Sequence, residues 1–298
     1  MKKKIAFIFT LLFVLGNVAF AAKWHAKHVV FIGMDGWGSY SVEKANMPNV
    51  KKLMADGAYT LKKRSVLPSS SAVNWASMFM GAGPEIHGYT TWNSKTPDLP
   101  SRVLNSHGIF PTICSLLREA SPKAEIGCIH EWDGIAYVVD TLALSFHKQI
   151  TAKPLNQHTT ACAVDYIKSK LPALALIVFD EPDHVGHAIG HDTPAYYEKL
   201  EELDGYIGQI VEAVKAAGIL DDTVFVLTSD HGGINKGHGG KTLLEMESPF
   251  IISGKGIKKG LVFEESMMQF DVASTIAYIF RLEQPQAWIG RPMLQVFK

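Results

Sequence analysis

Three runs of apolar residues constrain the fold most strongly, because each is followed closely by acidic or histidine side chains. The runs are 28–34 (HVVFIGM), 174–179 (LALIVF) and 223–228 (TVFVLT). Their length and continuous apolar character are typical of strands buried on both faces of a parallel sheet. Ligands of such sheets bind at the carboxyl ends of the strands. The polar residues after the runs are therefore predicted to meet at one edge of the sheet.

Segments with helical periodicity alternate with these strands. We predict helices over 47–55, 71–80, 112–119, 158–170, 194–217 and 271–279, and further strands over 125–129 and 249–253. The alternation predicts an α/β fold with a mainly parallel central sheet, and a buried parallel sheet carries helices on both faces. No repeat or long linker interrupts the chain, so residues 22–298 are predicted to form a single domain.

The first 21 residues have the pattern of a cleavable export signal. Three lysines precede an apolar stretch from Ile5 to Leu15, and Ala19-Phe20-Ala21 fits the small-x-small cleavage rule. We predict cleavage after Ala21 and a periplasmic or secreted mature protein without a stable membrane anchor. The alternative is an uncleaved anchor, for which the apolar stretch is short.

Charge and cysteine content exclude some functions. The chain has 29 basic and 29 acidic residues and no basic run, so no nucleic-acid surface is predicted and any ligand is expected at a local site. Cys114, Cys128 and Cys162 lack CxxC spacing, which argues against a thiolate metal site. A disulfide between Cys114 and Cys128 and buried free thiols both remain open.

Acidic and histidine residues near the strand ends have the spacing of metal ligands. Asp183 and His187 are four residues apart, so one helical turn places them on the same face. Asp230 and His231 precede two glycines, which permit the sharp turn that could bring both side chains to one site. The candidate ligands are Asp35, Asp183, His187, Asp230, His231 and His238.

These six side chains supply three carboxylates and three imidazoles, enough for two closely spaced divalent cations. Mixed nitrogen and oxygen ligands without thiolate predict zinc first, with manganese or iron as alternatives. His184 and His191 lie nearby but are not needed to complete the sites. The other histidines considered are interpreted as surface or packing residues: His25, His87, His107, His130, His147 and His158.

Residues 68–75 (PSSSAVNW) run from a polar loop into the helix predicted from Ser71. A hydroxyl at a helix start lies beside free backbone N–H groups and the positive end of the dipole, a favourable place for a phosphoryl group. A neighbouring cation would lower the pKa of the hydroxyl and make it a nucleophile. From this segment alone, serines that only cap the helix are the simpler interpretation.

Taken together, the motifs resemble the alkaline phosphatase superfamily, specifically its nucleotide pyrophosphatase/phosphodiesterase branch. The matching stretches are MDGWG (34–38), SSSAVNW (69–75), GAGPEIHGY (81–89), EPDHVGH (181–187), SDHGG (229–233) and GHGG (237–240). They occur in the family's order and span nearly the whole mature chain. The resemblance implies an alkaline phosphatase-like fold with its metal site at the carboxyl ends of the strands.

The resemblance also implies a role for each candidate residue. Ser71 would be the nucleophile, and Asn74, three residues later, would help to hold a phosphoryl oxygen. Asp183, His187 and His238 would bind one zinc ion, and Asp35, Asp230 and His231 would bind the second, together with Ser71. The implied reaction is a double displacement through a phosphoserine, with retained configuration at phosphorus.

Some features depart from the family pattern. Ser-Ala-Val-Asn stands where many diesterases of this branch have Thr-Phe-Pro-Asn, and serine is also the nucleophile of phosphomonoesterases in the superfamily. No counterpart is evident for the arginine that clamps the extra charge of a monoester, because Arg64 and Arg102 cannot be placed. The cysteine-proline-arginine signature of formylglycine sulfatases is absent, and the chain is too short for the cap domain of phosphosugar mutases.

The sequence therefore predicts an exported phosphodiesterase or nucleotide pyrophosphatase that acts on a small-molecule phosphate ester. One alternative is a phosphomonoesterase or phosphonate hydrolase on the same core. A periplasmic metal- or phosphate-binding protein without turnover is disfavoured because every expected ligand and the nucleophile are present. Tyr89, Trp92 and Trp132 could stack on a base or aryl group, although large aromatic residues more often pack loops onto the core.

Overall fold

The structure is a computed structural model that describes residues 24–298. The predicted signal segment 1–21 and its cleavage site lie outside the described residues. None of the helices in the described part of the chain is both long and apolar enough to span a membrane.

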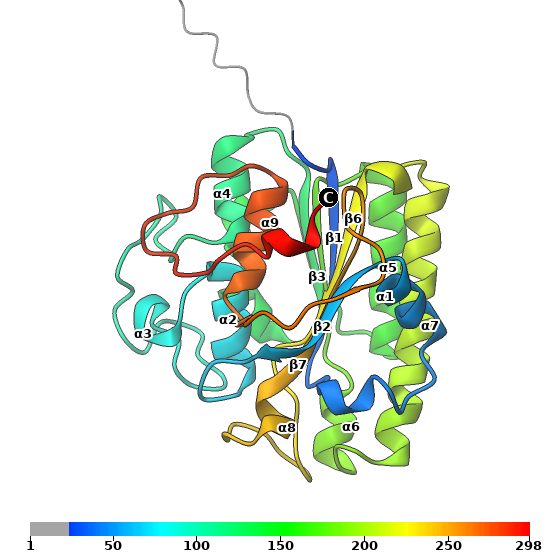
Figure 1. Ribbon diagram of the computed structural model, residues 1–298. Coiled ribbons are helices and arrows are strands. Elements are labelled where there is room, and N and C mark those ends of the chain that lie inside the picture. The colour runs from blue at the N-terminus through cyan, green and yellow to red at the C-terminus, as the bar shows by residue number, and fades with distance from the viewer. Residues whose placement is uncertain (1–23) are drawn as a thin grey trace, which may run out of the picture.

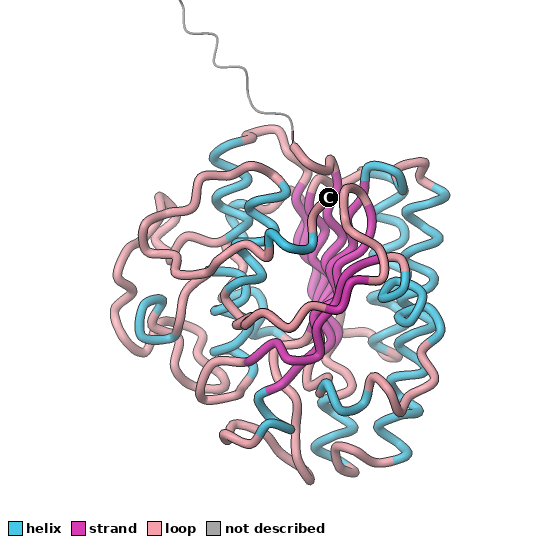
Figure 2. The backbone as a smooth tube through the Cα atoms, in the orientation of Figure 1, coloured by secondary structure: helices cyan, strands magenta, loops and turns pink. Residues whose placement is uncertain are grey.

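Eight strands form one sheet in the order β4-β3-β5-β1-β6-β7-β2-β8, which runs through the centre of the molecule (Figure 2). The strands are β1 His28–Met34, β2 Gly57–Arg64, β3 Ile126–His130, β4 Phe146–Gln149, β5 Leu174–Phe179, β6 Thr223–Thr228, β7 Glu247–Gly254 and β8 Leu261–Val262. The five strands from β4 to β6 in this order are parallel, and only β7 runs antiparallel to both of its neighbours. The predicted mainly parallel α/β sheet is confirmed.

Helices cover both faces of this sheet, as predicted (Figure 1). Their bounds are α1 Pro48–Ala55, α2 Ser71–Met80, α3 Pro84–His87, α4 Ile113–Ala120, α5 Leu155–Lys170, α6 Asp183–Ala188, α7 Pro194–Ala216, α8 Leu243–Met246 and α9 Asp271–Ile279. Short 3-10 helices cover Ser39–Ser41, Asp133–Tyr137, Thr141–Ala143, Leu220–Asp222 and Leu294–Val296.

Alternating side chains of the central strands divide the hydrophobic core into two layers. Phe31 packs in the layer of α2, α4 and α9, whereas Ile32 packs in the layer of α1, α5 and α7. Both side chains are completely buried. This two-sided burial explains why β1, β5 and β6 are apolar throughout, and why their predicted bounds match the structure residue for residue.

The register of the central strands brings the candidate ligands to one edge. β1 lies between β5 and β6, and Gly33 is paired with Val178 on one side and Thr228 on the other. The backbone N–H of Asp35 then donates to the carbonyl of Phe179 (3.0 Å), and that of Asp183 donates to the carbonyl of Asp35 (3.1 Å). The segments that follow β1, β5 and β6 therefore lie side by side.

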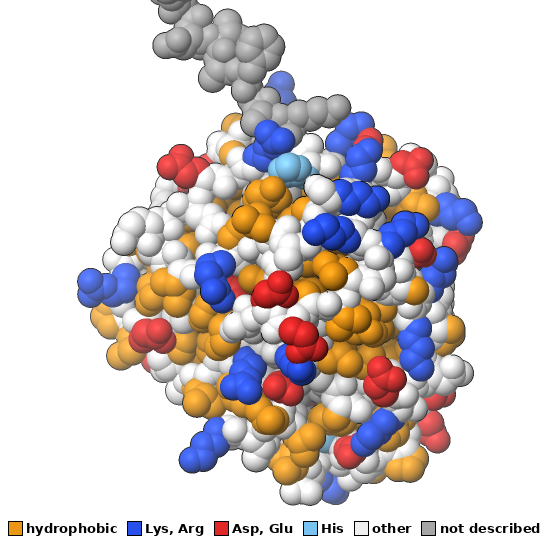
Figure 3. All heavy atoms as spheres, viewed as in Figure 1, with side chains coloured by type: hydrophobic (Ala, Val, Ile, Leu, Met, Phe, Trp, Pro, Cys, Tyr) orange, Lys and Arg blue, Asp and Glu red, His pale blue; other side chains and the backbone are white. Residues whose placement is uncertain are grey.

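Some elements were not predicted. Strand β2 contains two lysines in an irregular apolar pattern, and β4 is a four-residue strand at the sheet edge whose side chains are largely exposed. Neither has the apolar run that identifies a buried strand. Cys114, Cys128 and Cys162 are all free, so the Cys114–Cys128 disulfide is not formed. On the face seen in Figure 3, basic and acidic side chains are interspersed with apolar ones.

Candidate metal centre and active site

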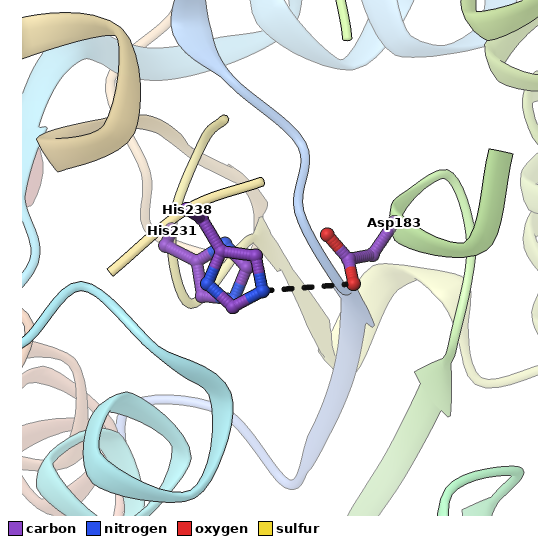
Figure 4. Close-up of side chains that lie close together, drawn as sticks. All are labelled: Asp183, His231 and His238. Carbon is purple, nitrogen blue, oxygen red and sulfur yellow. Dashed lines mark ion pairs between the residues drawn. The ribbon is translucent and has the colours of Figure 1, made fainter. Parts of the chain in front are cut away.

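The structure brings all six predicted ligands to the carboxyl edge of the sheet. Asp35 follows β1, and Asp183 and His187 lie on α6, which follows β5. Asp230 and His231 follow β6, and His238 lies in the glycine-rich loop further along. Figure 4 shows Asp183 facing the rings of His231 and His238, which stack on one another with centroids 3.8 Å apart.

The first group of ligand atoms comes from Asp35, Asp230 and His231, all of them buried, and these atoms lie within 4.8 Å of one another. His231 Nε2 is 3.2 Å from Asp230 Oδ2 and 3.5 Å from Asp35 Oδ1. Its Nδ1 lies 2.8 Å from the carbonyl of Gly232, an acceptor. His231 therefore carries its proton on Nδ1, and the lone pair of Nε2 is directed at the two carboxylates.

Two oxygens in this group lack a hydrogen-bond donor. Asp35 Oδ1 and Asp230 Oδ2 are buried without a hydrogen-bond partner, although the second oxygen of Asp35 accepts from Trp75 Nε1 (3.0 Å). Asp230 Oδ1 accepts from the backbone N–H groups of Gly36 (3.1 Å) and His231 (3.0 Å). Buried acceptors that face one another without a donor are costly, and a cation between them removes that cost. The group therefore fits a divalent cation.

The pKa values of the two carboxyl groups and the imidazole in this first group are all shifted by burial. Burial, reinforced by the charge of Asp230, raises the pKa of Asp35 well above its usual value, and burial likewise raises the pKa of Asp230. Burial lowers the pKa of His231 to about 3, which keeps its imidazole neutral and able to bind a cation.

The second group is formed by Asp183, His187 and His238, close to His231. Asp183 Oδ2 is 3.1 Å from His187 Nε2 and 3.9 Å from His238 Nε2, and these two nitrogens are 3.1 Å apart. Asp183, His231 and His238 offer ligand atoms within 4.8 Å of one another. The first group thus has two carboxylates and one imidazole, and the second has one carboxylate and two imidazoles.

Backbone carbonyls orient the histidines of the second group as they do His231. His187 Nδ1 is 2.9 Å from the carbonyl of Lys236, and His238 Nδ1 is 3.0 Å from the carbonyl of Ser69. Each ring donates from Nδ1 and directs Nε2 into the site, which is the usual arrangement of metal-bound histidines. The Asp183 carboxylate raises the pKa of His187 to about 9, so a proton and a cation compete for Nε2.

Ser71 is the serine of the triplet that faces the ligands. It is the first residue of α2, and its Oγ is 3.2 Å from His231 Nε2. Ser69 Oγ instead donates to the carbonyl of Gly240 (2.7 Å), and Ser70 Oγ is buried without a partner. The hydroxyl of Ser71 is therefore placed beside the first ligand group, at the positive end of the helix dipole.

Asn74 is completely buried, and its side-chain amide forms hydrogen bonds with backbone groups. Its Oδ1 accepts from the N–H of Val66 (2.7 Å), and its Nδ2 lies 3.0 Å from the carbonyls of Pro68 and Ser70. These bonds hold the turn that leads into α2. Contact between the Asn74 amide and a phosphoryl oxygen remains a prediction.

Histidines 184 and 191 have different surroundings. His191 is buried, and its Nε2 lies 3.3 Å from the Oδ1 of Asp183, so it orients that carboxylate from behind. Its ring packs so tightly on Gly186 that a Cβ there would lie 2.4 Å from it. His184 is largely exposed and pairs with Asp180 at 3.1 Å, and this hydrogen bond raises its pKa to about 9.

Sequence reasoning missed three residues that support the ligands from behind. Trp75 holds Asp35 as described above, while Lys63 Nζ donates to the carbonyl of Ser229 (2.7 Å) and Gln269 Nε2 donates to that of Asp230 (3.0 Å). Burial lowers the pKa of Lys63 to about 7. Nothing local marks these residues, because their partners lie about 40 to 170 positions away.

A small cavity of about 170 Å³ connects the ligands with solvent. Its wall is formed by Ser71 and three of the predicted ligands, Asp183, His187 and His238, together with Trp92, Trp132, Asp180 and His184. Of the aromatic residues singled out from the sequence, Tyr89 is buried and donates to the carbonyl of Tyr137, so it packs a loop. Arg64 lies 3.6 Å from Glu247, Arg102 is exposed, and neither lines the cavity.

The sheet, with the site at its carboxyl edge, has the alkaline phosphatase-like fold. Solved structures with similar folds support this assignment. Murine ectonucleotide pyrophosphatase/phosphodiesterase 5, in an inactive form in complex with AMP, superposes with a TM-score of 0.74 at 15% identity, over 91% of this chain and 98% of that chain. A phosphonate monoester hydrolase from Silicibacter pomeroyi gives 0.69 at 16% identity, over 90% and 76% of the two chains.

The family follows from the sequence match. The model of the type I phosphodiesterase / nucleotide pyrophosphatase family matches residues 29–254, and the chain belongs to this family. Venom phosphodiesterase 2 of Crotalus adamanteus is 24% identical over 224 residues, covering 71% of this chain and 27% of that protein. The bis(5'-adenosyl)-triphosphatase enpp4 of Mus musculus is 21% identical over 220 residues, covering 70% and 47%. The chain thus spans about a quarter of the length of the venom relatives it matches.

Proposed function

We propose that this chain is an exported two-metal hydrolase of phosphoric esters, which acts as a phosphodiesterase or nucleotide pyrophosphatase through a phosphoserine on Ser71. The observation that carries the proposal is the position of the Ser71 hydroxyl, 3.2 Å from His231 Nε2 and beside a ligand group with two unpartnered carboxylate oxygens. A nucleophile next to a cation site is the arrangement that phosphoryl transfer requires. Family membership supports the same reaction class.

Two divalent cations, zinc first, would occupy the two ligand groups. Asp35, Asp230 and His231 would hold the one beside Ser71, and Asp183, His187 and His238 would hold the other. When bound, the cations would stabilise the charge on the attacking, leaving and transferring oxygens. The carbonyl-oriented rings and the buried carboxylates are preorganised for this purpose, because their ligand atoms are fixed by the backbone.

The residues of the chain perform the remaining steps. Ser71 Oγ forms a bond to phosphorus while the bond to the leaving alcohol breaks, which gives the phosphoserine. Water then attacks the phosphoserine from the side the alcohol left, and the serine hydroxyl is restored. Two inversions retain the configuration at phosphorus. The start of α2 places the positive end of its dipole next to the transferring group.

The charge of the cavity favours a diester over a monoester. A monoester carries an additional negative charge, which phosphomonoesterases commonly neutralise with a basic side chain. Among the described residues that line the cavity there is no lysine or arginine. A diester carries only one negative charge on its phosphoryl group, and the two proposed cations can neutralise that charge.

The test uses zinc-loaded protein with bis(p-nitrophenyl) phosphate and p-nitrophenyl phosphate. We expect a higher kcat/KM for the diester, and a loss of about 10³-fold or more in kcat for Ser71→Ala, while Asp35, Asp230 and His231 keep the neighbouring site occupied. Ser106→Ala, at an exposed serine outside the cavity, is the matched control. Asp183→Asn and His238→Ala should lower the metal content instead.

Each alternative function corresponds to a distinct outcome. A kcat/KM ratio of diester to monoester below one would assign the protein to phosphomonoesterases, and preference for a phosphonate ester would assign it to phosphonate hydrolases. Full metal occupancy without turnover would identify a binding protein. Export is tested separately by sequencing the amino terminus of protein from the periplasm or medium, which should begin at residue 22.

A further inference from the structure

A second cavity adjoins the reaction cavity and is larger, at about 560 Å³. We call this larger cavity the side groove. It shares Trp92, His187 and His238 with the reaction cavity, and its other lining residues are Pro68, Ser70, Thr90, Thr91 and Gly239. A phosphoryl group held between His187 and Ser71 would thus have one substituent within reach of this groove. The groove is the natural place for one of the two ester groups of a diester.

The side groove carries no formal charge apart from the two histidines it shares with the metal site. Its other lining residues are proline, serine, threonine, tryptophan and glycine. The reaction cavity adds two carboxylates, Asp180 and Asp183, and no lysine or arginine. Apart from the two proposed cations and the histidines of the metal site, the only positively charged side chain among the described residues that line either cavity is His184, which is already paired with Asp180.

Two lysines that lie within three residues of a lining residue already have partners, whereas Lys241, two residues after Gly239, is exposed. Lys95 Nζ is 2.7 Å from Asp133 Oδ2, and Lys236 Nζ donates to the carbonyl of Ala188 (2.9 Å). His184 pairs with Asp180 as described above. To pair with Lys95, Lys236 or His184, a polyphosphate chain would have to break these contacts, which costs binding free energy.

The wall of the groove is preorganised for an apolar group. The Trp92 side chain is 61% exposed, yet its backbone is fixed because its carbonyl accepts from the N–H of Ala72 (3.1 Å). The Asp98 carboxylate accepts from the N–H groups of Thr90 (2.9 Å) and Thr91 (3.2 Å), which holds the same loop. An exposed indole on a fixed loop beside a reaction centre provides apolar binding area without an ordering cost.

Ser70 adds one neutral hydrogen-bonding group to this wall. The residue is only 4% exposed, and its Oγ has no hydrogen-bond partner, although its neighbours Ser69 and Ser71 both have partners. A buried hydroxyl without a partner is unfavourable, and rotation of this side chain toward the groove would let it donate to an ester oxygen of a ligand.

We propose, building on the function proposed above, that the side groove binds an uncharged apolar substituent, aryl or alkyl, of a phosphodiester with a single negative charge. Nucleoside polyphosphates, with their additional charges, are poor substrates of this site. The chain thereby separates from relatives whose names refer to polyphosphate substrates, such as the murine bis(5'-adenosyl)-triphosphatase.

Three substrates test the proposal with zinc-loaded protein. Phenyl p-nitrophenyl phosphate and methyl p-nitrophenyl phosphate share a leaving group and a charge and differ in the second substituent. The ratio of their kcat/KM values is divided by the ratio of their spontaneous hydrolysis rates. This corrected ratio measures how much the groove favours the phenyl group. We expect this corrected ratio to be about tenfold or more, the scale of burying part of a phenyl ring. ATP should have a kcat/KM at least about 100-fold below that of the phenyl diester.

Two variants test the two halves of the argument independently. Trp92→Ala should lower the corrected phenyl-to-methyl ratio at least about fivefold. Thr91→Lys places a cation at the exposed rim of the groove and should raise the kcat/KM of ATP relative to the phenyl diester about tenfold. Ser106→Lys makes a matched change from a small hydroxyl residue to lysine outside both cavities and should leave that ratio unchanged.

The outcomes separate this proposal from the function on which it rests. Diester hydrolysis that depends on Ser71 but shows a corrected ratio near one, or an ATP rate equal to that of the phenyl diester, would overturn the groove proposal alone. No Ser71-dependent hydrolysis of any ester would overturn both.

Discussion

The substitution Asp35→Asn should change stability in opposite directions in the metal-free and the zinc-loaded protein. Asp35 is buried, and its Oδ1 faces His231 Nε2 and the Asp230 carboxylate without a hydrogen-bond donor. In the metal-free protein, asparagine removes a buried charge while keeping an acceptor for Trp75 and providing an N–H for His231. In the loaded protein, the same change removes a ligand.

The expected magnitudes follow from linkage. Replacing the buried carboxylate, whose Oδ1 has no hydrogen-bond donor, should raise the free energy of unfolding of the metal-free protein by about 1–3 kcal/mol. An ion present at a hundredfold excess over its Kd stabilises the folded state by about 2.7 kcal/mol, so two ions contribute about 5 kcal/mol. At roughly 2 °C per kcal/mol for a chain of this size, chelation should lower the Tm of the wild-type protein by about 10 °C.

The assay is thermal unfolding of both proteins with EDTA and with excess zinc, followed by metal analysis. We expect Asp35→Asn to have the higher Tm in EDTA, the lower Tm in zinc, and to retain fewer ions per chain. Asp204→Asn is the control, because Asp204 is equally buried but accepts from the N–H groups of Asn49 and Val50. It should lose stability equally in both conditions. An Asp35→Asn curve that shifts in the same direction with and without zinc would refute the reasoning.

Three further predictions concern residues away from the reacting atoms. Trp75→Phe removes the indole N–H that donates to Asp35, whereas the indole N–H of the equally buried Trp37 has no partner. Trp75→Phe should therefore lower the free energy of unfolding by about 1.5–3 kcal/mol more than Trp37→Phe does. Chemical unfolding measures both variants, and equal losses would contradict this prediction. Burial lowers the pKa of His87 to about 3, so the unfolded state binds a proton first as pH falls below 6.5. His87 alone should then lower the stability by up to about 1.4 kcal/mol per pH unit from pH 6.5 to pH 3, and His87→Gln should reduce the total slope by this amount in a pH series of unfolding curves. Burial lowers the pKa of Lys63 to about 7, so the unfolded state binds more protons between pH 7 and 10.5, and stability should rise with pH across this window in the wild type but not in Lys63→Met.

The two proposals place different demands on the same molecule. The proposed reaction at Ser71 needs two cations, for which the structure offers converging ligand atoms, whereas the proposed substrate choice depends on the uncharged walls around Trp92. Within a family, the cation sites can be retained while the walls of the substrate cavity differ, because the loops at the strand ends are tied to the core through only a few contacts. The substrate panel therefore tests a property of this chain rather than of its fold.

Local sequence patterns determined the elements and the chemical nature of the site. Five elements, β1, β5, β6, α2 and α9, have the predicted bounds, because burial on both faces of a strand or at a helix interface leaves a continuous or periodic apolar pattern. The types of polar side chain at this edge were also predictable, since carboxylates and imidazoles that follow such strands must lie near the carboxyl edge of the sheet. The exposed edge strand β4 left no such pattern and was missed.

Only the tertiary structure decided which atoms meet. Ser71 and His231 are 160 positions apart, and although the resemblance selects Ser71 from the serine triplet, only the structure shows that its Oγ, and not that of Ser69 or Ser70, lies beside His231. The backbone use of the Asn74 amide and the position of Trp92 between two cavities follow in the same way from contacts between distant segments. Periodicity reports the burial of one segment, whereas distances between segments depend on strand register and loop packing, which no local pattern encodes.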